Sequence, residues 1–406
     1  MMARSCLELT FCGKHFINPF IISASPASDS REKVERAFIA GWAGVVFKTV
    51  SLPEYAPSLA SPYMIGIDCK SAKQLGMLNT DLISERTVYD IAEDIRYFKQ
   101  KYPDRILIGS IMAAYQSHWT QLVEILEDAG ADMIELSMSC PQGEQSIARN
   151  AEMVSQVIPA SDPALMLETT RVVKNAVKKG TPVIVKMTPN VTDIAQLALM
   201  AQKGGADAVC AIDTLRGFAG VDVETGRPKL NTNGFGTWGG LSGPLLKPVA
   251  LAAITKIKTL CPQLPVSGVG GISSWEDAAE FILLGAAPLQ ICTAISKYGL
   301  GLAESLCKNL SAYMERKGYA SVSDMLGRSL PYLVEHSKLS RTAHCLCNID
   351  ESKCIHCGKC AVCCSDYAYG ALSLPADGGA PHVDAELCRG CGACASVCPR
   401  NAISYR

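Results

Sequence analysis

The sequence predicts an α/β protein in which a (β/α)8 TIM barrel is followed by a small cysteine-rich domain. Apolar segments typical of strands alternate with amphipathic segments typical of helices from about residue 18 to residue 295. Cysteine is unevenly distributed, because eleven of the nineteen cysteines lie in the last 62 residues. This change in composition predicts three parts: a barrel over residues 1–310, a helical linker over 311–346 and a cysteine-rich domain over 347–406.

Eight apolar segments are expected to form the barrel strands. Their apolar residues are continuous rather than alternating, which is typical of parallel strands covered on both faces. The expected strands are Phe20–Ala24, Gly44–Thr49, Ile106–Met112, Met133–Ser137, Val183–Met187, Ala208–Asp213, Pro265–Val269 and Leu289–Thr293. A doubly wound open sheet is the alternative arrangement for such a pattern.

The segments between the strands carry helix signals. The expected helices are Thr87–Tyr102, Trp119–Asp128, Pro163–Val177 and Trp275–Leu284, with Leu302–Arg316 and Val322–Leu326 after the barrel. Ser274 and Asp277 have the spacing of a capping box, and Pro163 follows Asp162 at an expected first helical position. Two longer segments, 52–83 and 140–162, follow the second and fourth strands, where a barrel builds its active-site loops.

Charge and hydropathy exclude several classes of partner. Lysine and arginine total 38 and aspartate and glutamate total 39, so the basic surplus of a nucleic-acid-binding protein is absent. No apolar run is long enough to span a membrane, and the N-terminal residues do not resemble a signal peptide. We therefore expect a cytoplasmic protein, in an oligomer, that binds neither nucleic acid nor membrane.

The cysteine-rich domain contains two runs with identical spacing. Cys354-x2-Cys357-x2-Cys360-x3-Cys364 is followed by Cys388-x2-Cys391-x2-Cys394-x3-Cys398-Pro399. This is the spacing of two-cluster ferredoxins, in which the fourth cysteine of each run ligates the other cluster. The first [4Fe–4S] site is therefore expected to contain Cys354, Cys357, Cys360 and Cys398, and the second Cys388, Cys391, Cys394 and Cys364.

Zinc is the alternative use of such cysteines. Structural zinc prefers paired CxxC motifs that supply two thiolates each, and two four-cysteine runs at equal spacing fit that pattern poorly. The remaining cysteines of this region, Cys345, Cys347 and Cys363, are interpreted as plain small residues.

A flavin is the expected cofactor of the barrel. Iron–sulfur clusters carry single electrons, and flavin is the usual centre that converts them into a two-electron product. Loops after the seventh and eighth strands form the usual phosphate site of such barrels, and here those strands end in Ser267-Gly268-Val269-Gly270-Gly271 and Ile291-Cys292-Thr293. A further glycine-rich loop is expected at 238–243. The match of residues 234–239 to G-x-G-x-x-G lacks the strand and helix of a nicotinamide site.

Three residues at strand ends are candidates for chemistry. Lys48 and Lys186 end apolar strands, so their side chains are expected to point into the site, where a positive charge stabilises an anionic reduced flavin. A rim lysine in a surface ion pair is the alternative. Cys140 opens the segment that follows the fourth strand, and its thiol is placed either to donate a proton to a substrate carbon or to be an inert buried group.

Several motifs resemble a known family. They are Asn18-Pro19-Phe20, Phe47-Lys48-Thr49, Ile111-Met112, Ser139-Cys140-Pro141-Gln142, Lys186-Met187-Thr188-Pro189-Asn190, Gly270-Gly271-Ile272, Leu289-Gln290 and the ferredoxin-like cysteine runs. Together they resemble the dihydropyrimidine dehydrogenase family, in particular its bacterial PreA-type FMN/iron–sulfur subunit, and the barrel resembles class 1 dihydroorotate dehydrogenases. The resemblance implies that electrons from NAD(P)H pass through FAD and the clusters to FMN, which reduces the C5–C6 bond of uracil or thymine.

The resemblance also implies individual site residues. Cys140 aligns with the proton donor of the family and Lys186 with the lysine that contacts reduced flavin. The other implied FMN contacts are Ala24, Lys48, Thr49, Gly243, Val269, Gly270, Gly271, Cys292 and Thr293. The implied substrate contacts are Asn79, Ser137, Met138, Ser139, Asp213 and Thr214.

Two positions depart from the family pattern, which carries asparagine where this chain has Ser137 and Asp213. An ionised aspartate only accepts hydrogen bonds, so either Asp213 is protonated or the bound ring is richer in N–H groups than a pyrimidine imide. The alternatives are therefore the same chemistry on a different cyclic amide or enone, a dihydroorotate-type dehydrogenase with Cys140 as base, and an electron-transfer subunit with a structural barrel. The expected partner is a PreT-like FAD/NAD(P)H-binding flavoprotein subunit or a ferredoxin.

Overall fold

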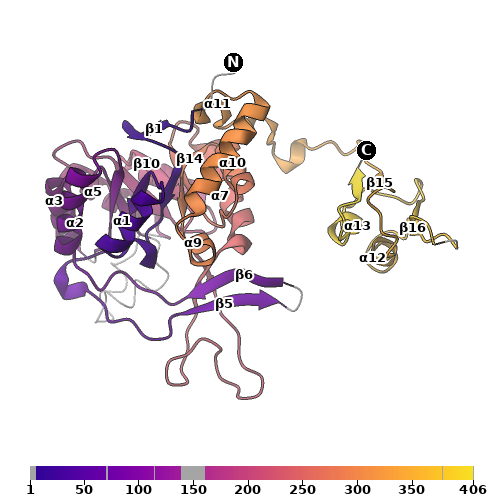
Figure 1. Cartoon of the computed structure of the whole chain (residues 1–406), viewed down its shortest axis with the longest axis horizontal. Helices are drawn as coiled ribbons and strands as arrows, with labels where there is room; N and C mark the ends of the chain where they lie inside the picture. The colour runs from indigo at the N-terminus through magenta and orange to yellow at the C-terminus, as the bar shows by residue number, and fades with distance from the viewer. Residues whose placement is uncertain (1–5, 70–71, 114, 139–160, 377, 406) are drawn as a thin grey trace. The chain divides into compact units, whose positions relative to one another are not determined.

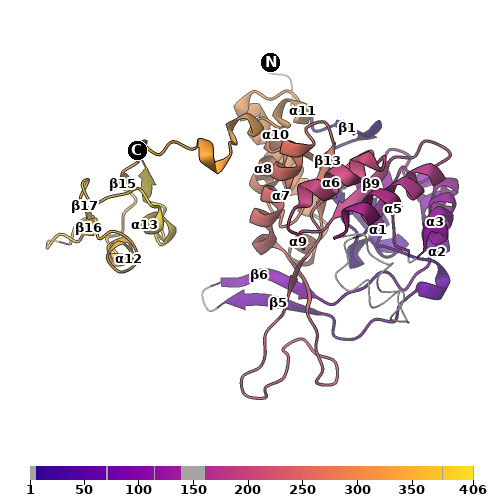
Figure 2. The same cartoon turned by 180° about the vertical axis from the view of Figure 1, so that it is seen from behind.

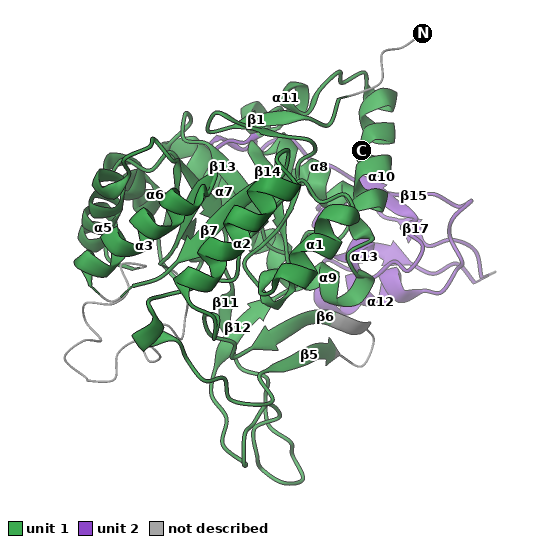
Figure 3. Cartoon of the chain, turned by 60° about the vertical axis from the view of Figure 1, so that its left-hand side comes forward, with its two compact units in different colours: residues 1–332 green, residues 333–406 purple. Residues whose placement is uncertain are grey.

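The computed structural model describes residues 6–69, 72–113, 115–138, 161–376 and 378–405. The chain divides into two compact units, residues 1–332 and 333–406, and each has a hydrophobic core of its own (Figure 3). The helix α10 (Leu302–Lys317) spans residue 310, where the barrel is predicted to end. The boundaries at 310 and 346 stay predictions.

The first unit is a closed barrel of eight parallel strands (Figure 1). The order around the barrel is β10-β13-β14-β3-β4-β7-β8-β9, which confirms the predicted barrel and excludes an open doubly wound sheet. The strands are β3 (Phe20–Ile22), β4 (Gly44–Val46), β7 (Ile106–Ile111), β8 (Met133–Ser137), β9 (Val183–Met187), β10 (Ala208–Ala211), β13 (Val266–Val269) and β14 (Ala286–Ile291).

Several strands end earlier than the sequence predicts. Lys48 and Thr49 follow β4 and Asp213 follows β10, although the prediction placed them inside strands. The apolar residues of a strand and of the loop after it are both buried, so continuous hydrophobicity does not locate the last ladder bond. In the same way, β14 begins at Ala286 rather than Leu289. The displaced residues lie in loops at the carboxyl ends of the strands, where barrels carry their active sites.

Helices form the outer layer of the barrel (Figure 2). They are α1 (Arg31–Ile39), α2 (Val88–Lys101), α3 (Gln116–Ala129), α5 (Pro163–Ala176), α6 (Ile194–Lys203), α7 (Lys247–Leu260), α8 (Trp275–Leu283) and α9 (Thr293–Tyr298), followed by α10 and α11 (Val322–Met325). Ser274 and Asp277 form the predicted capping box of α8, and Pro163 occupies the first turn of α5. A two-stranded sheet, β1 (Leu9–Phe11) with β2 (Lys14–Phe16), precedes the barrel.

A second sheet is built from segments that the sequence predicts to be loops. The antiparallel strands β5 (Met64–Cys69) and β6 (Ala72–Asn79) lie within the segment 52–83, and they join β12 (Gly239–Ser242) and β11 (Leu215–Gly217) in the order β11-β12-β6-β5. The prediction of a glycine-rich loop over 238–243 is wrong for residues 239–242, which form β12. No helix begins at Gly239, which agrees with the rejection of a nicotinamide motif there.

The second unit is small and contains short elements. Its strands are β15 (Cys347–Ile349) with β18 (Ile403–Tyr405) and β16 (Leu372–Ser373) with β17 (His382–Val383), and its helices are α12 (Lys359–Tyr367) and α13 (Ala393–Ser396). Gly358 and Gly392 precede these helices with φ of +70° and +91°, a backbone region that favours glycine. Among the described residues of both units, no helix combines the length and the apolar character needed to cross a membrane.

Candidate active site

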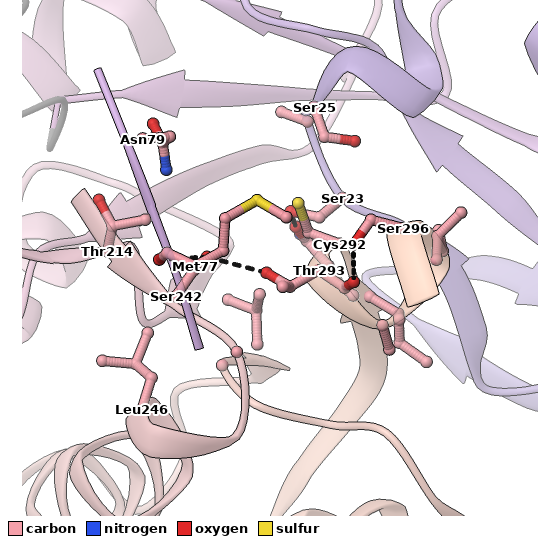
Figure 4. Close-up of a pocket in the computed structure, with 18 of the residues that line it drawn as sticks. Ser23, Ser25, Met77, Asn79, Thr214, Ser242, Leu246, Cys292, Thr293 and Ser296 are labelled. Carbon is pink, nitrogen blue, oxygen red and sulfur yellow. Dashed lines mark hydrogen bonds between the residues drawn. The ribbon is translucent and has the colours of Figure 1, made fainter. Parts of the chain in front are cut away.

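A cavity of about 710 Å³ lies at the carboxyl ends of the barrel strands. Its walls come from residues after several barrel strands and from β5, β6 and β12 of the second sheet. Figure 4 shows Thr293, the first residue of α9, beside Ser242 of β12, and the Thr293 hydroxyl donates to the Ser242 hydroxyl at 2.9 Å. The volume is in the range of small-molecule and cofactor sites, so the second sheet completes a binding site that the barrel begins.

Most of the predicted site residues line this cavity. The residues predicted to contact FMN all do: Ala24, Lys48, Thr49, Lys186, Gly243, Val269, Gly270, Gly271, Cys292 and Thr293. Of the predicted substrate contacts, Asn79, Ser137, Asp213 and Thr214 line it. Met138 is instead buried in the barrel core, with 1% of its surface exposed. Ser139 and Cys140 lie outside the described residues.

Bare glycine backbone forms one end of the cavity. Gly271 has a φ of +80°, and a Cβ added there would lie 2.8 Å from the Lys247 amide nitrogen and 2.9 Å from the Gly243 carbonyl oxygen. Gly270 has a φ of +125°, and its added Cβ would lie 2.9 Å from the Cβ of Ala250. A phosphate group needs such close access to backbone amides. The residues present therefore fit the phosphate end of FMN.

Replacing Gly271 by alanine is expected to weaken FMN binding by at least about tenfold, which corresponds to about 1.4 kcal/mol. The new methyl group would enter the glycine-lined end of the cavity, which we call the glycine cradle. The left-handed backbone would add a strain of about 1–2 kcal/mol. Titration of the FMN-depleted chain with FMN measures the change. Gly180→Ala is the matched control, because Gly180 has a φ of +76° but open space around its added Cβ. Equal FMN affinity in the two variants would contradict the prediction that the glycine cradle holds the phosphate end of FMN.

Lys186 is buried on β9, with 6% of its surface exposed. Its ammonium donates to the Ser23 hydroxyl at 3.2 Å and lies 3.6 Å from Oε1 of Glu135, which is fully buried on β8. Burial is the largest single effect and lowers the pKa of Lys186, but the negatively charged surroundings, of which Glu135 contributes most, together raise the pKa above its usual value. The cavity wall therefore includes a buried cation, a group of the kind that would stabilise negative charge on a bound flavin.

Lys48 provides a second buried cation. Only 4% of its surface is exposed, and its ammonium donates to Asp81 at 3.0 Å and lies 3.9 Å from Asp29. Burial raises the pKa of Asp81 above its usual range although Lys48 opposes the shift. This geometry disfavours the alternative of a rim lysine in a surface ion pair.

Polar groups on the other side of the cavity suit a ring with amide edges. The Asn79 amide donates to the Gly240 carbonyl at 3.1 Å, and Oδ1 of Asp213 accepts from the Thr214 amide at 2.8 Å. Asn190 fixes this loop, because its amide donates to the Thr214 carbonyl at 3.0 Å and its carbonyl accepts from the Arg216 amide at 2.8 Å. Amide, hydroxyl and carboxylate groups therefore line one wall.

The eight predicted cluster cysteines separate into two groups in the second unit. One small cavity is lined by Cys354, Cys357, Cys360 and Cys398, and another by Cys364, Cys388, Cys391 and Cys394. Each group combines three cysteines of one run with the fourth of the other, as the spacing predicts. This crossed grouping fits two cubane clusters, whereas structural zinc usually takes its thiolates from paired CxxC motifs.

Cys347 lies beside the second group of cluster cysteines, and its interpretation as a plain small residue stays a prediction. It is 7% exposed, lines the second cysteine cavity, and its sulfur lies 3.7 Å from that of Cys394. Cys363 instead donates to the Ala393 carbonyl at 3.5 Å. Cys347 lies outside both runs, so only the pairing of β15 with β18 brings it to this cavity.

Sequence reasoning missed the charged and polar partners of the two lysines. Glu135 lies within an apolar strand segment, which is a detectable signal because a charge buried in a barrel strand needs a partner. Gln290 lies within another such strand and is 1% exposed. Asp29 and Asp81 lie in loops, and no local pattern distinguishes them from surface acids.

Comparison with known proteins agrees with this architecture. The family model described as dihydroorotate dehydrogenase matches residues 6–314, and the model described as a 4Fe-4S dicluster domain matches residues 347–405. NAD-dependent dihydropyrimidine dehydrogenase subunit PreA of Escherichia coli is 36% identical over 99% of this chain and 96% of its own length. The chloroplastic dihydropyrimidine dehydrogenase (NADP(+)) of Arabidopsis thaliana is 34% identical over 82% of this chain and 79% of its own length.

A third relative represents the barrel alone. The catalytic subunit of dihydroorotate dehydrogenase B (NAD(+)) from Methanosarcina mazei is 35% identical over 80% of this chain and 95% of its own length. The barrel, the cavity and the cysteine groups account for both matched regions. The chain therefore belongs to the dihydroorotate dehydrogenase family, in the form found in dihydropyrimidine dehydrogenase subunit PreA, with an FMN-binding barrel joined to a 4Fe-4S dicluster domain.

Proposed function

We propose that this chain is the catalytic subunit of an FMN/iron–sulfur oxidoreductase that reduces or oxidises a C–C double bond of a pyrimidine-like ring. The observation that carries the proposal is the cavity, in which a glycine cradle, two buried lysines and a wall of amide-binding groups meet. Two groups of four cysteines in the same chain supply sites for electron transfer. The relatives named for dihydropyrimidine dehydrogenase support the substrate class.

Each part of the cavity has a task in this reaction. Bound FMN supplies the two-electron chemistry, and reducing one double bond requires a hydride at one carbon and a proton at its neighbour. Asn79, Thr214 and Asp213 orient the ring through its amide edge. Lys186 stabilises developing negative charge, and Cys140, which follows β8, delivers the proton. In the oxidising direction Cys140 takes the proton instead.

Electrons are proposed to enter through a second protein. An NAD(P)H-dependent FAD flavoprotein subunit of PreT type is the first candidate, and a ferredoxin is the second. The relative from Escherichia coli is described as an NAD-dependent subunit, which supports the first. We place this system in the cytoplasm, because free thiols and cluster ligands persist in a reducing compartment. We also propose that the protein forms an oligomer.

The test is anaerobic turnover with the full chain and an artificial reductant. Uracil, thymine, orotate, and a panel of cyclic ureides, lactams and enones are offered, and the reduced products are measured. Reduction of uracil or thymine supports the proposal, and preferential reduction of orotate to dihydroorotate supports the dihydroorotate-type alternative. Failure to turn over any ring, in a chain with full FMN and iron content, would favour an electron-transfer subunit with a structural barrel.

A second candidate substrate is a ring with more N–H groups than uracil, and Asp213 is the observation that favours it. Its carboxylate lines the cavity and already accepts from the Thr214 amide. An imide carbonyl of uracil that faces an ionised Asp213 carboxylate finds no hydrogen-bond donor there. An unsatisfied buried group costs about 1–3 kcal/mol. Ser137, the other departure from the family pattern, is shorter than asparagine and leaves room on the β8 side.

Replacing Asp213 by asparagine is therefore expected to raise kcat/KM for uracil by about tenfold or more, since 1.4 kcal/mol is a factor of ten. The amide supplies both a donor and an acceptor to the imide edge. Steady-state kinetics with uracil and with a ring that has more N–H groups measure the change. Asp222→Asn, in an exposed loop, is the control. Unchanged or lower kcat/KM for uracil would show that the native site already accepts the imide.

A further inference from the structure

A closed circuit of four buried polar side chains crosses the barrel, and three of them line the cavity. Lys186 donates to the Ser23 hydroxyl at 3.2 Å, which donates to Oε1 of Gln290 at 3.1 Å. The amide nitrogen of Gln290 donates to Oε2 of Glu135 at 2.6 Å, and Oε1 of Glu135 lies 3.6 Å from the Lys186 ammonium. None of the four residues is more than 6% exposed.

The circuit joins opposite sides of the barrel. In the strand order β10-β13-β14-β3-β4-β7-β8-β9, the strand of Gln290 (β14) is diametrically opposite that of Glu135 (β8), and β3, which precedes Ser23, is opposite that of Lys186 (β9). Lys186 and Ser23 line the cavity, as does Gln290, whereas Glu135 does not. Glu135 is thus behind the cation, on the side away from a cavity ligand.

The Glu135 carboxylate lies between an amide and a cation. Oε2 accepts from the Gln290 amide and Oε1 lies beside the Lys186 ammonium, while the Cys210 thiol on β10 also interacts with this carboxylate. A lone buried carboxylate or ammonium is costly, whereas the two together are stabilised by their attraction. The carboxylate and the lysine are therefore mutually dependent.

We propose that Glu135 is the positioning residue that keeps Lys186 charged and directed into the cavity in both redox states of the bound flavin. The positive charge is then in place before negative charge develops, and reduction requires no proton uptake by the lysine. This role rests on the proposed function only in that FMN occupies the cavity; it does not depend on the identity of the substrate.

Other titratable groups around the lysine do not replace Glu135. Burial raises the pKa of the Cys210 thiol, on the neighbouring strand β10, well above its usual range, so this thiol is neutral. Asp213, which follows β10, acts on Lys186 through its charge more weakly than Glu135, and burial raises the pKa of the Cys292 thiol, which follows β14, above its usual value. Glu135 is the group with the largest favourable effect on the ammonium.

The direct test is the pH dependence of the FMN midpoint potential in the full chain, without substrate. In wild-type protein we expect lysine protonation to contribute nothing to the pH dependence of the midpoint potential between about pH 6 and pH 9. In Glu135→Gln, Lys186 is expected to lose its proton in the oxidised state and to regain it on reduction. The variant then takes up one further proton per FMN reduced, and its potential falls more steeply with pH. An unchanged slope would overturn the proposal.

Control variants separate this role from a structural one. Glu127 is another buried glutamate, 4% exposed, which accepts from the Lys178 and Lys179 amides at 2.8 Å and does not line the cavity of the described structure. Glu127→Gln is expected to lower stability without changing the slope. Glu135→Asp keeps the charge and is expected to restore the wild-type slope, and Lys186→Met combined with Glu135→Gln is expected to remove the added proton.

A second measurement does not require Glu135→Gln to fold. In Lys186→Met the Glu135 carboxylate loses its cation, so its pKa in the folded state rises above the unfolded value. The folded state then binds more protons, and the loss of stability caused by the substitution increases as pH rises. Thermal unfolding of the full chain at pH 5 and pH 8 is expected to show a larger Tm difference from wild type at pH 8. Equal differences at both values would show that the two groups are not paired.

Discussion

Replacing Cys140 by serine is expected to lower the rate of substrate reduction by about 10²–10⁴-fold, the usual effect of losing a positioned general acid. A serine hydroxyl is a much weaker acid than a thiol, so proton delivery to the substrate carbon becomes limiting. Absorbance spectra of the flavin and clusters are expected to stay unchanged, because the residues placed around those sites are untouched. Stopped-flow mixing of reduced protein with substrate measures the step.

The control for Cys140→Ser is Cys307→Ser, a thiol-to-hydroxyl change in α10. Burial raises the pKa of Cys307 to about 11, so its thiol is neutral, and it does not line the cavity of the described structure. This variant is expected to turn over at the wild-type rate. If Cys140→Ser also reduced every substrate at the wild-type rate, the barrel would have no acid at this position. That result would favour the alternative of an electron-transfer subunit with a structural barrel.

Replacing Cys364 by alanine is expected to remove the second cluster and stop electron delivery from the donor protein. Cys364 lines the cavity with Cys388, Cys391 and Cys394, although it belongs to the first run. Each cubane needs four thiolates, so iron content is expected to fall by about half. Dithionite, which can reach FMN directly, is expected to reduce it still. Iron analysis and EPR spectroscopy of the reduced protein measure these changes.

The adjacent cysteine is the matched control for Cys364. Cys363 lies on the same helix but donates to the Ala393 carbonyl and lines neither cavity in the described part of the second unit. Cys363→Ala is expected to retain both clusters. Cys364→Ala and Cys388→Ala are expected to lose the same EPR signal. Loss of different signals would mean that each run holds its own cluster, against the crossed arrangement.

Features that depend on short stretches of sequence could be predicted before the structure was known. Continuous apolar segments identify strands covered on both faces, so all eight barrel strands were predictable to within a few residues. Fixed cysteine spacing identifies cluster ligands, because ligands a few residues apart must converge on one group. The positions of Lys186 and Gly271 beside the cavity were also predictable from local sequence, since the carboxyl ends of barrel strands face the active site.

Contacts between groups far apart in the sequence became visible in the folded chain alone. The circuit of Lys186, Ser23, Gln290 and Glu135 depends on strands that are opposite in a closed barrel, and closure is not visible in any local pattern. The second sheet pairs β6 with β12 across more than a hundred residues, so each strand looked like a loop on its own. Cys347 reaches a cluster cavity through the β15–β18 pair. Periodicity reports burial along one segment, whereas partners are set by the packing of several.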